Sequence, residues 1–129
     1  MAEFNELQAI NTMYFYPPAG EAMQSFKHLS PEQAHSMLQE QDCQLADIRD
    51  EQSYQRGHIP NATHLNEQSL PSFLESADHN KALIIYCYHG NTSLDAAQFL
   101  AEKAFTEVYS MDGGFESWRV KFPQEVKMG

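Results

Sequence analysis

One short stretch of the chain has the residue types and the spacing to hold a reactive sulfur. Cys87 ends the apolar run ALIIYC, and the polar segment up to Ser93 leads into LDAAQFLAEKA, which has the apolar spacing of a helix. A thiol is a nucleophile only as its thiolate, and an anion is stabilised by a helix N-terminus and by surrounding backbone N–H groups. The sequence therefore predicts a nucleophilic cysteine inside a ring of amide donors.

The residues that follow the cysteine suit such a loop. Gly90 permits a tight or left-handed turn, and Asn91 also tolerates that conformation. Thr92 and Ser93 are expected to cap the helix and to add hydroxyl donors. We predict Cys87 as the catalytic residue, and the substrate-binding residues as Tyr88, His89, Gly90, Asn91, Thr92 and Ser93.

The elements around this loop alternate between short apolar strands and helices. Strands are expected over 25–29, 43–48, 62–65, 82–87 and 107–111, and helices after Ser30, after Asp50, around 70–74, over 93–103 and over 115–122. Ser30 and Gln33 form a capping-box pattern, and Gly57 is expected to stop the second helix. This alternation predicts an α/β domain with a mainly parallel sheet and helices on both faces. Ligands of such sheets bind beyond the carboxyl ends of the strands, where Cys87 is placed.

The chain of 129 residues suits one domain with a real core. Residues 1–24 differ from the rest because they show no sustained period and contain PP and AG breakers. We expect 1–24 to be an appended or weakly ordered N-terminal extension and 25–129 to be the domain. A short helix or strand docked by Tyr14, Phe15 and Tyr16 is the alternative.

Composition excludes several classes of function. The net charge of −10 disfavours nucleic-acid binding, which needs a basic face. No segment approaches the about 20 apolar residues of a membrane helix, and the N-terminus lacks a secretory signal pattern, so a cytoplasmic location is expected. Cys43 and Cys87 are too few for a disulfide framework and too far apart for a C-x-x-C pair.

The residue six positions after the cysteine separates two chemistries. A cysteine phosphatase loop, C-x5-R, needs an arginine there to bind the phosphoryl oxygens, and this chain has Ser93. A small sulfur anion requires less, since a ring of N–H groups can hold a terminal sulfur. A phosphatase or arsenate reductase, and a non-catalytic binding module, remain as alternatives to sulfur chemistry.

Three stretches together resemble a known family. DIRDEQSYQRGHIPNATHL (47–65), IYCYHGNTS (85–93) and VYSMDGGFESW (108–118) resemble the single-domain rhodaneses, which are thiosulfate sulfurtransferases. The likeness spans residues 26 to about 126 and is greatest to the short enzymes of the family. It implies a rhodanese-like fold with a central sheet of five strands. It also implies that no metal or organic cofactor is needed.

The resemblance further implies a covalent mechanism in two half-reactions. Cys87 would attack the outer sulfur of thiosulfate, release sulfite, and pass the persulfide sulfur to cyanide or to a thiol acceptor such as a thioredoxin-like protein. The loop amides from Tyr88 to Ser93 would hold the persulfide. The chain departs from the family at Asn61, where glycine is common, and at Leu94-Asp95, where a basic residue often follows the loop. We therefore expect weak affinity for thiosulfate, and a protein persulfide as a possible natural donor.

Other residues invite functional readings that we weigh against structural ones. Cys43 is expected to be structural, with a resolving thiol as the alternative, and Asp47 with Arg49 to form a structural ion pair that ties loop amides. His89 would either tune the thiolate or face solvent. The spacing of the six histidines matches no metal-ligand pattern. Phe115 and Trp118 are expected to pack the last helix, or alternatively to wall the pocket.

Overall fold

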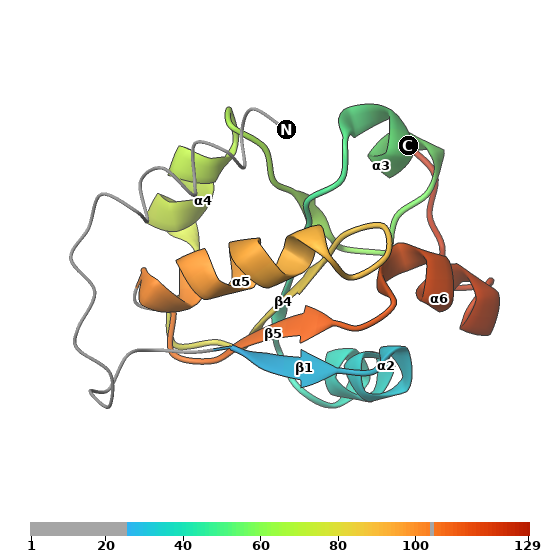
Figure 1. Ribbon diagram of the computed structural model, residues 1–129, viewed down its shortest axis with the longest axis horizontal. Helices are drawn as coiled ribbons and strands as arrows, with labels where there is room; N and C mark the ends of the chain where they lie inside the picture. The colour runs from blue at the N-terminus through green and yellow to red at the C-terminus, as the bar shows by residue number, and fades with distance from the viewer. Residues whose placement is uncertain (1–25, 104) are drawn as a thin grey trace.

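The computed structural model describes residues 26–103 and 105–129 (Figure 1). The extension expected over 1–24 lies outside these residues. The described strands are β1 (Lys27–Leu29), β2 (Gln44–Asp47), β3 (Thr63–His64), β4 (Leu83–Tyr86) and β5 (Val108–Met111). The helices are α2 (Pro31–Glu40), α3 (Glu51–Arg56), α4 (Leu70–Ser76), α5 (Thr92–Glu102) and α6 (Gly114–Lys121). None of these helices is long and apolar enough to cross a bilayer.

The strands form one sheet in the order β1-β5-β4-β2-β3. Every neighbouring pair in it is parallel, so the expected mainly parallel sheet is wholly parallel in the described residues. β4 is central and fully buried, as its continuous apolar sequence predicted. This arrangement brings the carboxyl ends of β4 and β5 to the same edge of the sheet.

Helices cover both faces of the sheet, which confirms the predicted α/β class. α5 lies on one side of β4 and β5, and α2 lies on the other (Figure 1). Because side chains alternate along a strand, Leu83 and Ile85 belong to the core under α5, while Ile84 and Tyr86 belong to the core under α2 and α6. The same alternation places Cys87 on the α5 side.

Local capping signals explain where the early helices begin and end. The Ser30 hydroxyl accepts a hydrogen bond from Gln33 N at 3.1 Å, and Gln33 Oε1 accepts one from Ser30 N at 2.9 Å. This is the predicted capping box. The Asp50 side chain accepts from Ser53 N at 3.1 Å, and α3 ends at Gly57, as expected. Each of these residues acts within one turn of chain, which is why the sequence alone reveals it.

Asn61, the first departure from the family pattern, stands at a turn that suits glycine. Its φ is 71°, and it is the one non-glycine residue with positive φ among the described residues. Asparagine tolerates this region better than other side chains do. The replacement therefore keeps the turn between Pro60 and β3.

Candidate active site

Cys87 directly follows β4, at the carboxyl edge of the sheet and at the start of the loop before α5. The residue is 5 % exposed. Its Sγ accepts hydrogen bonds from the backbone amides of Gly90 at 3.1 Å and Ser93 at 3.3 Å. The Ser93 hydroxyl oxygen lies 3.4 Å from the same sulfur. Three polar groups of the loop thus surround the sulfur, and each of them can donate to a thiolate.

The sulfur also takes the place of a helix cap. We expected Thr92 and Ser93 to cap α5, but the helix already begins at Thr92, and Asn91 before it makes no capping hydrogen bond with its side chain. Ser93 N, one of the orphan amides of the first turn, donates to Cys87 Sγ instead. The predicted caps are therefore wrong, because the tight loop brings the cysteine sulfur to the position that a capping oxygen usually occupies.

Gly90 gives the loop its sharp turn. Its φ is 94°, in the region where only glycine is unstrained, which confirms the expectation for this residue. Asn91 does not use the left-handed conformation that it tolerates, since its φ and ψ are −95° and −53°. One left-handed residue is enough to reverse the chain, and the next residue already approaches helical geometry.

A buried hydroxyl chain that the sequence analysis missed extends from the sulfur. The hydroxyl oxygens of Ser93 and Ser110 lie 2.8 Å apart, and both residues are fully buried. Ser110 is on β5, beside β4. If Ser110 donates to Ser93 and Ser93 donates to Cys87 Sγ, both hydroxyl protons are used, which favours a negatively charged sulfur. The sequence did contain a signal for this contact, because Ser110 is a polar residue within the buried strand VYSM.

The N-terminus of α6 is hydrogen-bonded to the start of the loop that follows Cys87. Phe115 N donates to the carbonyl oxygen of Cys87 at 2.8 Å, and Glu116 N donates to that of Tyr88 at 3.1 Å. Gly113 and Gly114 make this approach possible, with φ of 77° and 61°. A Cβ on Gly114 would lie 2.5 Å from both carbonyl oxygens. The two glycines therefore form a tight turn against the loop.

Anchoring the carbonyl groups also orients the amides. In a trans peptide the N–H points away from the C=O, so the N–H groups of Tyr88 and His89 point away from α6. These two amides and those of Asn91 and Thr92 donate no hydrogen bond to the described residues. The loop thus holds the amides of Gly90 and Ser93 on the sulfur, while the amides of Tyr88, His89, Asn91 and Thr92 have no acceptor among the described residues.

Comparisons with known proteins identify the family of this chain. Residues 30–121 match the model of the rhodanese-like domain. The chain belongs to the rhodanese-like family. It is 47% identical over 107 residues to the thiosulfate sulfurtransferase GlpE of Pseudomonas syringae pv. syringae (strain B728a), covering 83% of this chain and 100% of that protein. The GlpE protein of Ectopseudomonas mendocina (strain ymp) is 49% identical over 107 residues, covering 83% of this chain and 97% of that one.

Solved structures show the same fold. A rhodanese-like domain protein from Staphylococcus aureus superposes with a TM-score of 0.63 at 26% identity, over 72% of this chain and 91% of that chain. The resemblance seen in three stretches of sequence therefore holds over most of the described residues. It confirms the predicted rhodanese-like α/β fold.

Asp47 and Arg49 form the expected structural ion pair beside the rhodanese loop. Arg49 Nη2 lies 2.7 Å from Asp47 Oδ2, and Arg49 N donates to Asp47 Oδ1 at 2.9 Å. Both side chains are almost fully buried. Burial alone would lower the pKa of Arg49, but the hydrogen bonds and the charge of Asp47 raise it. Arg49 also donates to the carbonyl oxygen of Gly57 at 2.6 Å, so the pair ties β2 to the end of α3.

The aromatic rings and His89 of the rhodanese domain take different positions. Phe115 and Trp118 are buried and pack α6 against the sheet, as expected. Tyr88 is 43% exposed, and its ring stacks on the exposed ring of His89 at 5.1 Å between centroids. His89 is therefore an exposed residue of the loop, in accord with the expectation that it faces solvent.

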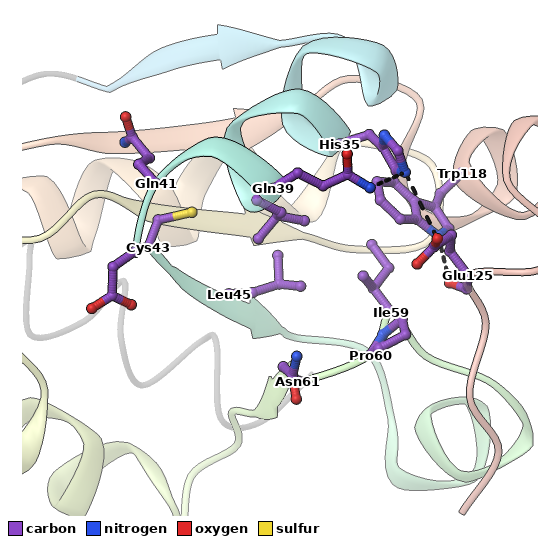
Figure 2. A pocket seen from close by; sticks show the side chains of 12 residues that line it. His35, Gln39, Gln41, Cys43, Leu45, Ile59, Pro60, Asn61, Trp118 and Glu125 are labelled. Carbon is purple, nitrogen blue, oxygen red and sulfur yellow. Dashed lines mark hydrogen bonds and ion pairs between the residues drawn. The ribbon is translucent and has the colours of Figure 1, made fainter.

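Cys43 lies outside the Cys87 loop of the rhodanese domain. It lines a cavity of about 460 Å³ on the α2 side of the sheet, in which Cys43 lies at one end and His35, Trp118 and Glu125 lie at the other (Figure 2). Its Sγ contacts the carbonyl oxygen of Met37 at 3.8 Å. Burial, followed by the charges of Asp42 and Glu107, raises the pKa of the Cys43 thiol. Such a thiol is a poor nucleophile near neutral pH.

Proposed function

We propose that this protein is a thiosulfate sulfurtransferase that carries sulfane sulfur on Cys87. The placement of Cys87 Sγ supports this most directly: it lies in a loop with two amide donors and a hydroxyl group at hydrogen-bonding distance. The curated relatives of matching length are thiosulfate sulfurtransferases. Four unbound loop amides beside the sulfur provide the donors that a bound sulfur anion needs.

In the first half-reaction the Cys87 thiolate attacks the outer sulfur of thiosulfate. The new bond joins Cys87 Sγ to that sulfur, the sulfur–sulfur bond of thiosulfate breaks, and its electron pair leaves with sulfite. The amides of Gly90 and Ser93 stabilise Sγ, and the free amides of Tyr88, His89, Asn91 and Thr92 are assigned to the outer sulfur. No oxidant or reductant is needed.

In the second half-reaction a nucleophile removes the outer sulfur and regenerates the thiolate. The acceptor is cyanide or a thiol, including the thiol of a thioredoxin-like protein. Because the first product leaves before the acceptor arrives, ping-pong kinetics are expected. A cytoplasmic location stays a prediction from the sequence.

The negative charge of the chain affects how tightly a sulfur donor is expected to bind. Ser93 is followed by Leu94 and Asp95 rather than by a cation, and the net charge is −10. A doubly charged donor therefore meets long-range repulsion. We expect a millimolar KM for thiosulfate, and a KM in the micromolar range at physiological ionic strength would contradict this. A protein persulfide remains the alternative donor.

The two other functions have less support. A phosphatase or arsenate reductase would need a cation at position 93, and Ser93 there is buried against Cys87 and Ser110. A non-catalytic binding module would not require a cysteine sulfur surrounded by hydrogen-bond donors. Phosphatase turnover that Cys87→Ser abolishes, in protein that forms no persulfide, would reverse this order.

The test is an intact mass of the reduced protein after incubation with thiosulfate. One added sulfur, mapped to the peptide of Cys87 and removed by cyanide as thiocyanate, is the expected result. Cys87→Ser should gain no sulfur, and Cys43→Ser should gain it as wild type does. Sulfur on Cys43, or unchanged mass with both thiosulfate and a protein persulfide, would overturn the proposal.

A further inference from the structure

All three arginines of the chain line a single cavity. Arg49, Arg56 and Arg119 are the only arginines in the sequence, and each borders a cavity of about 250 Å³ between α3, the loop and α6. The C-terminal residues run from α6 up beside α3 (Figure 1), and Val126 among them lines the cavity. The chain has a net charge of −10, so this cavity is a place where its few cations gather.

The deepest of the three guanidinium groups is rigid and only partly used. The Arg49 side chain is 3 % exposed, and its Nε and Nη2 donate to Asp47 and to the Gly57 carbonyl oxygen. None of the hydrogen bonds to Asp47 and Gly57 uses Nη1, and the Tyr86 hydroxyl group also interacts with the guanidinium group. The guanidinium carbon lies 4.1 Å from the centroid of the Phe115 ring, which holds the group flat. A donor pair is thus preorganised at the cavity wall.

The two outer arginines leave further donors. Arg56 ends α3, is exposed, and has no ion-pair or hydrogen-bond partner among the described residues. Arg119 binds Glu116 through Nε and Nη2, at 3.1 and 2.7 Å, which leaves Nη1. The hydrogen bond from Arg119 lowers the pKa of Glu116, the one acidic residue of the lining. Arg49 is paired with Asp47 and Arg119 with Glu116, so Arg56 is the cation of the lining that has no ion-pair partner among the described residues, and it favours an anion in the cavity.

The position of the cavity limits what that anion can be. Tyr88 lines it and directly follows Cys87, but Cys87 itself is not part of the lining. To take part in the reaction, an anion must occupy the cavity and also extend beyond its lining to Cys87 Sγ. A molecule with carboxylates on one end and a sulfur on the other can do both. Guanidinium groups bind carboxylates in a forked, bidentate geometry.

We propose that this arginine cavity binds the carboxylates of a small anionic thiol that accepts sulfur from the Cys87 persulfide, an inference that rests on the proposed function. The thiolate of the acceptor attacks the outer sulfur, and a new sulfur–sulfur bond forms. The bond between the two persulfide sulfurs breaks, and its electron pair returns to Cys87 as thiolate. The outer sulfur leaves as part of the acceptor's persulfide anion, so atoms and charge balance without a proton transfer.

The test compares two acceptors with protein already loaded with sulfur by thiosulfate. Mercaptosuccinate carries two carboxylates, and 2-mercaptoethanol carries none. The double variant Arg56→Gln/Arg119→Gln should lower kcat/KM for mercaptosuccinate about tenfold, because charge-assisted pairs with its carboxylates are lost. The kcat/KM for 2-mercaptoethanol should stay within about twofold of the wild-type value. The double variant Lys27→Gln/Lys81→Gln, at the opposite end of the sheet, makes a matched change of charge and should leave both unchanged.

Three results would overturn the proposal: equal losses for both acceptors, no loss for mercaptosuccinate, or a rise in the thiosulfate KM in place of the acceptor effect. Binding of succinate to Cys87→Ser, measured by NMR titration with and without the two arginine changes, separates this inference from the proposed function. If succinate binds in an arginine-dependent way but wild-type protein forms no persulfide, the anion site stands and the proposed sulfur transfer fails. If the persulfide forms normally but succinate does not bind, the sulfurtransferase function stands and the anion site fails.

Discussion

Cys43 and Cys87 lie at opposite ends of two neighbouring parallel strands. β2 and β4 are in register from Gln44 opposite Leu83 to Asp47 opposite Tyr86, so Cys43 precedes this ladder and Cys87 follows it. At about 3.3 Å per residue, the two Cα atoms are about 16 Å apart, whereas a disulfide needs at most about 7 Å. The structure therefore contradicts a role for Cys43 as a resolving thiol.

The first prediction concerns oxidation. Because the strands hold the two thiols apart, diamide should produce no intramolecular disulfide in the folded monomer. Intact mass under non-reducing conditions checks this, and an internal disulfide would appear as a loss of two hydrogens. Cys43→Ala should retain persulfide formation on Cys87. A Cys43–Cys87 disulfide in folded protein would show that the sheet opens.

Alkylation should distinguish the two thiols. Cys43 borders an open cavity, so access does not protect it, but its raised pKa leaves little thiolate near pH 7. Iodoacetamide should therefore modify Cys87 first, since amide and hydroxyl donors stabilise its sulfur anion. Labelling at Cys43 should begin to rise only at a higher pH than an ordinary thiol requires. Peptide mapping against time and pH measures this, and equal rates at pH 7 would contradict it.

Ser93→Ala should slow persulfide formation. The variant keeps the Ser93 amide but removes the hydroxyl group 3.4 Å from Cys87 Sγ. A hydrogen bond to a charged group contributes about 1.5–3 kcal/mol, so the rate with thiosulfate should fall at least about tenfold. Ser76→Ala, at the exposed end of α4, is the control and should react as wild type does. An unchanged rate of persulfide formation in folded Ser93→Ala would show that the hydroxyl group does not contribute to the reaction.

Gly114→Ala should destabilise the protein. Its Cβ would meet the carbonyl oxygens of Cys87 and Tyr88 at 2.5 Å, and its φ of 61° is strained for alanine. Overpacking and left-handed strain together cost about 3 kcal/mol, measured by urea denaturation. Gly129→Ala, which has a positive φ but no atom within 4 Å of its Cβ, should cost far less. Wild-type stability of Gly114→Ala would show that α6 can move away from the loop.

Short-range signals explain what the sequence revealed. The capping box at Ser30 and the left-handed turn at Gly90 act within a few residues, so pattern and residue type suffice to find them. The unbroken apolar run of β4 likewise identified the central strand. These signals placed Cys87 at the edge of the sheet and inside its loop.

Long-range contacts explain what the sequence did not reveal. Ser110 reaches Ser93 only because β5 pairs beside β4, and the three arginines meet only when α3 and α6 pack on either side of the loop. The wrong caps have the same origin, since a folded-back Cys87 sulfur replaced a local oxygen. Strand order and helix packing decide such contacts, and no local pattern encodes them.

The contact between α6 and the loop has a consequence for biosynthesis. Cys87 leaves the ribosome before α6, and until that helix folds, the carbonyl groups of Cys87 and Tyr88 lack the partners that orient their peptides. The orientation of these two peptides therefore depends on α6, and we expect Cys87 to react at its full rate only after Gly114 has docked against the loop. A sulfur carrier built in this way is expected to load after synthesis has passed α6, the last of the described helices.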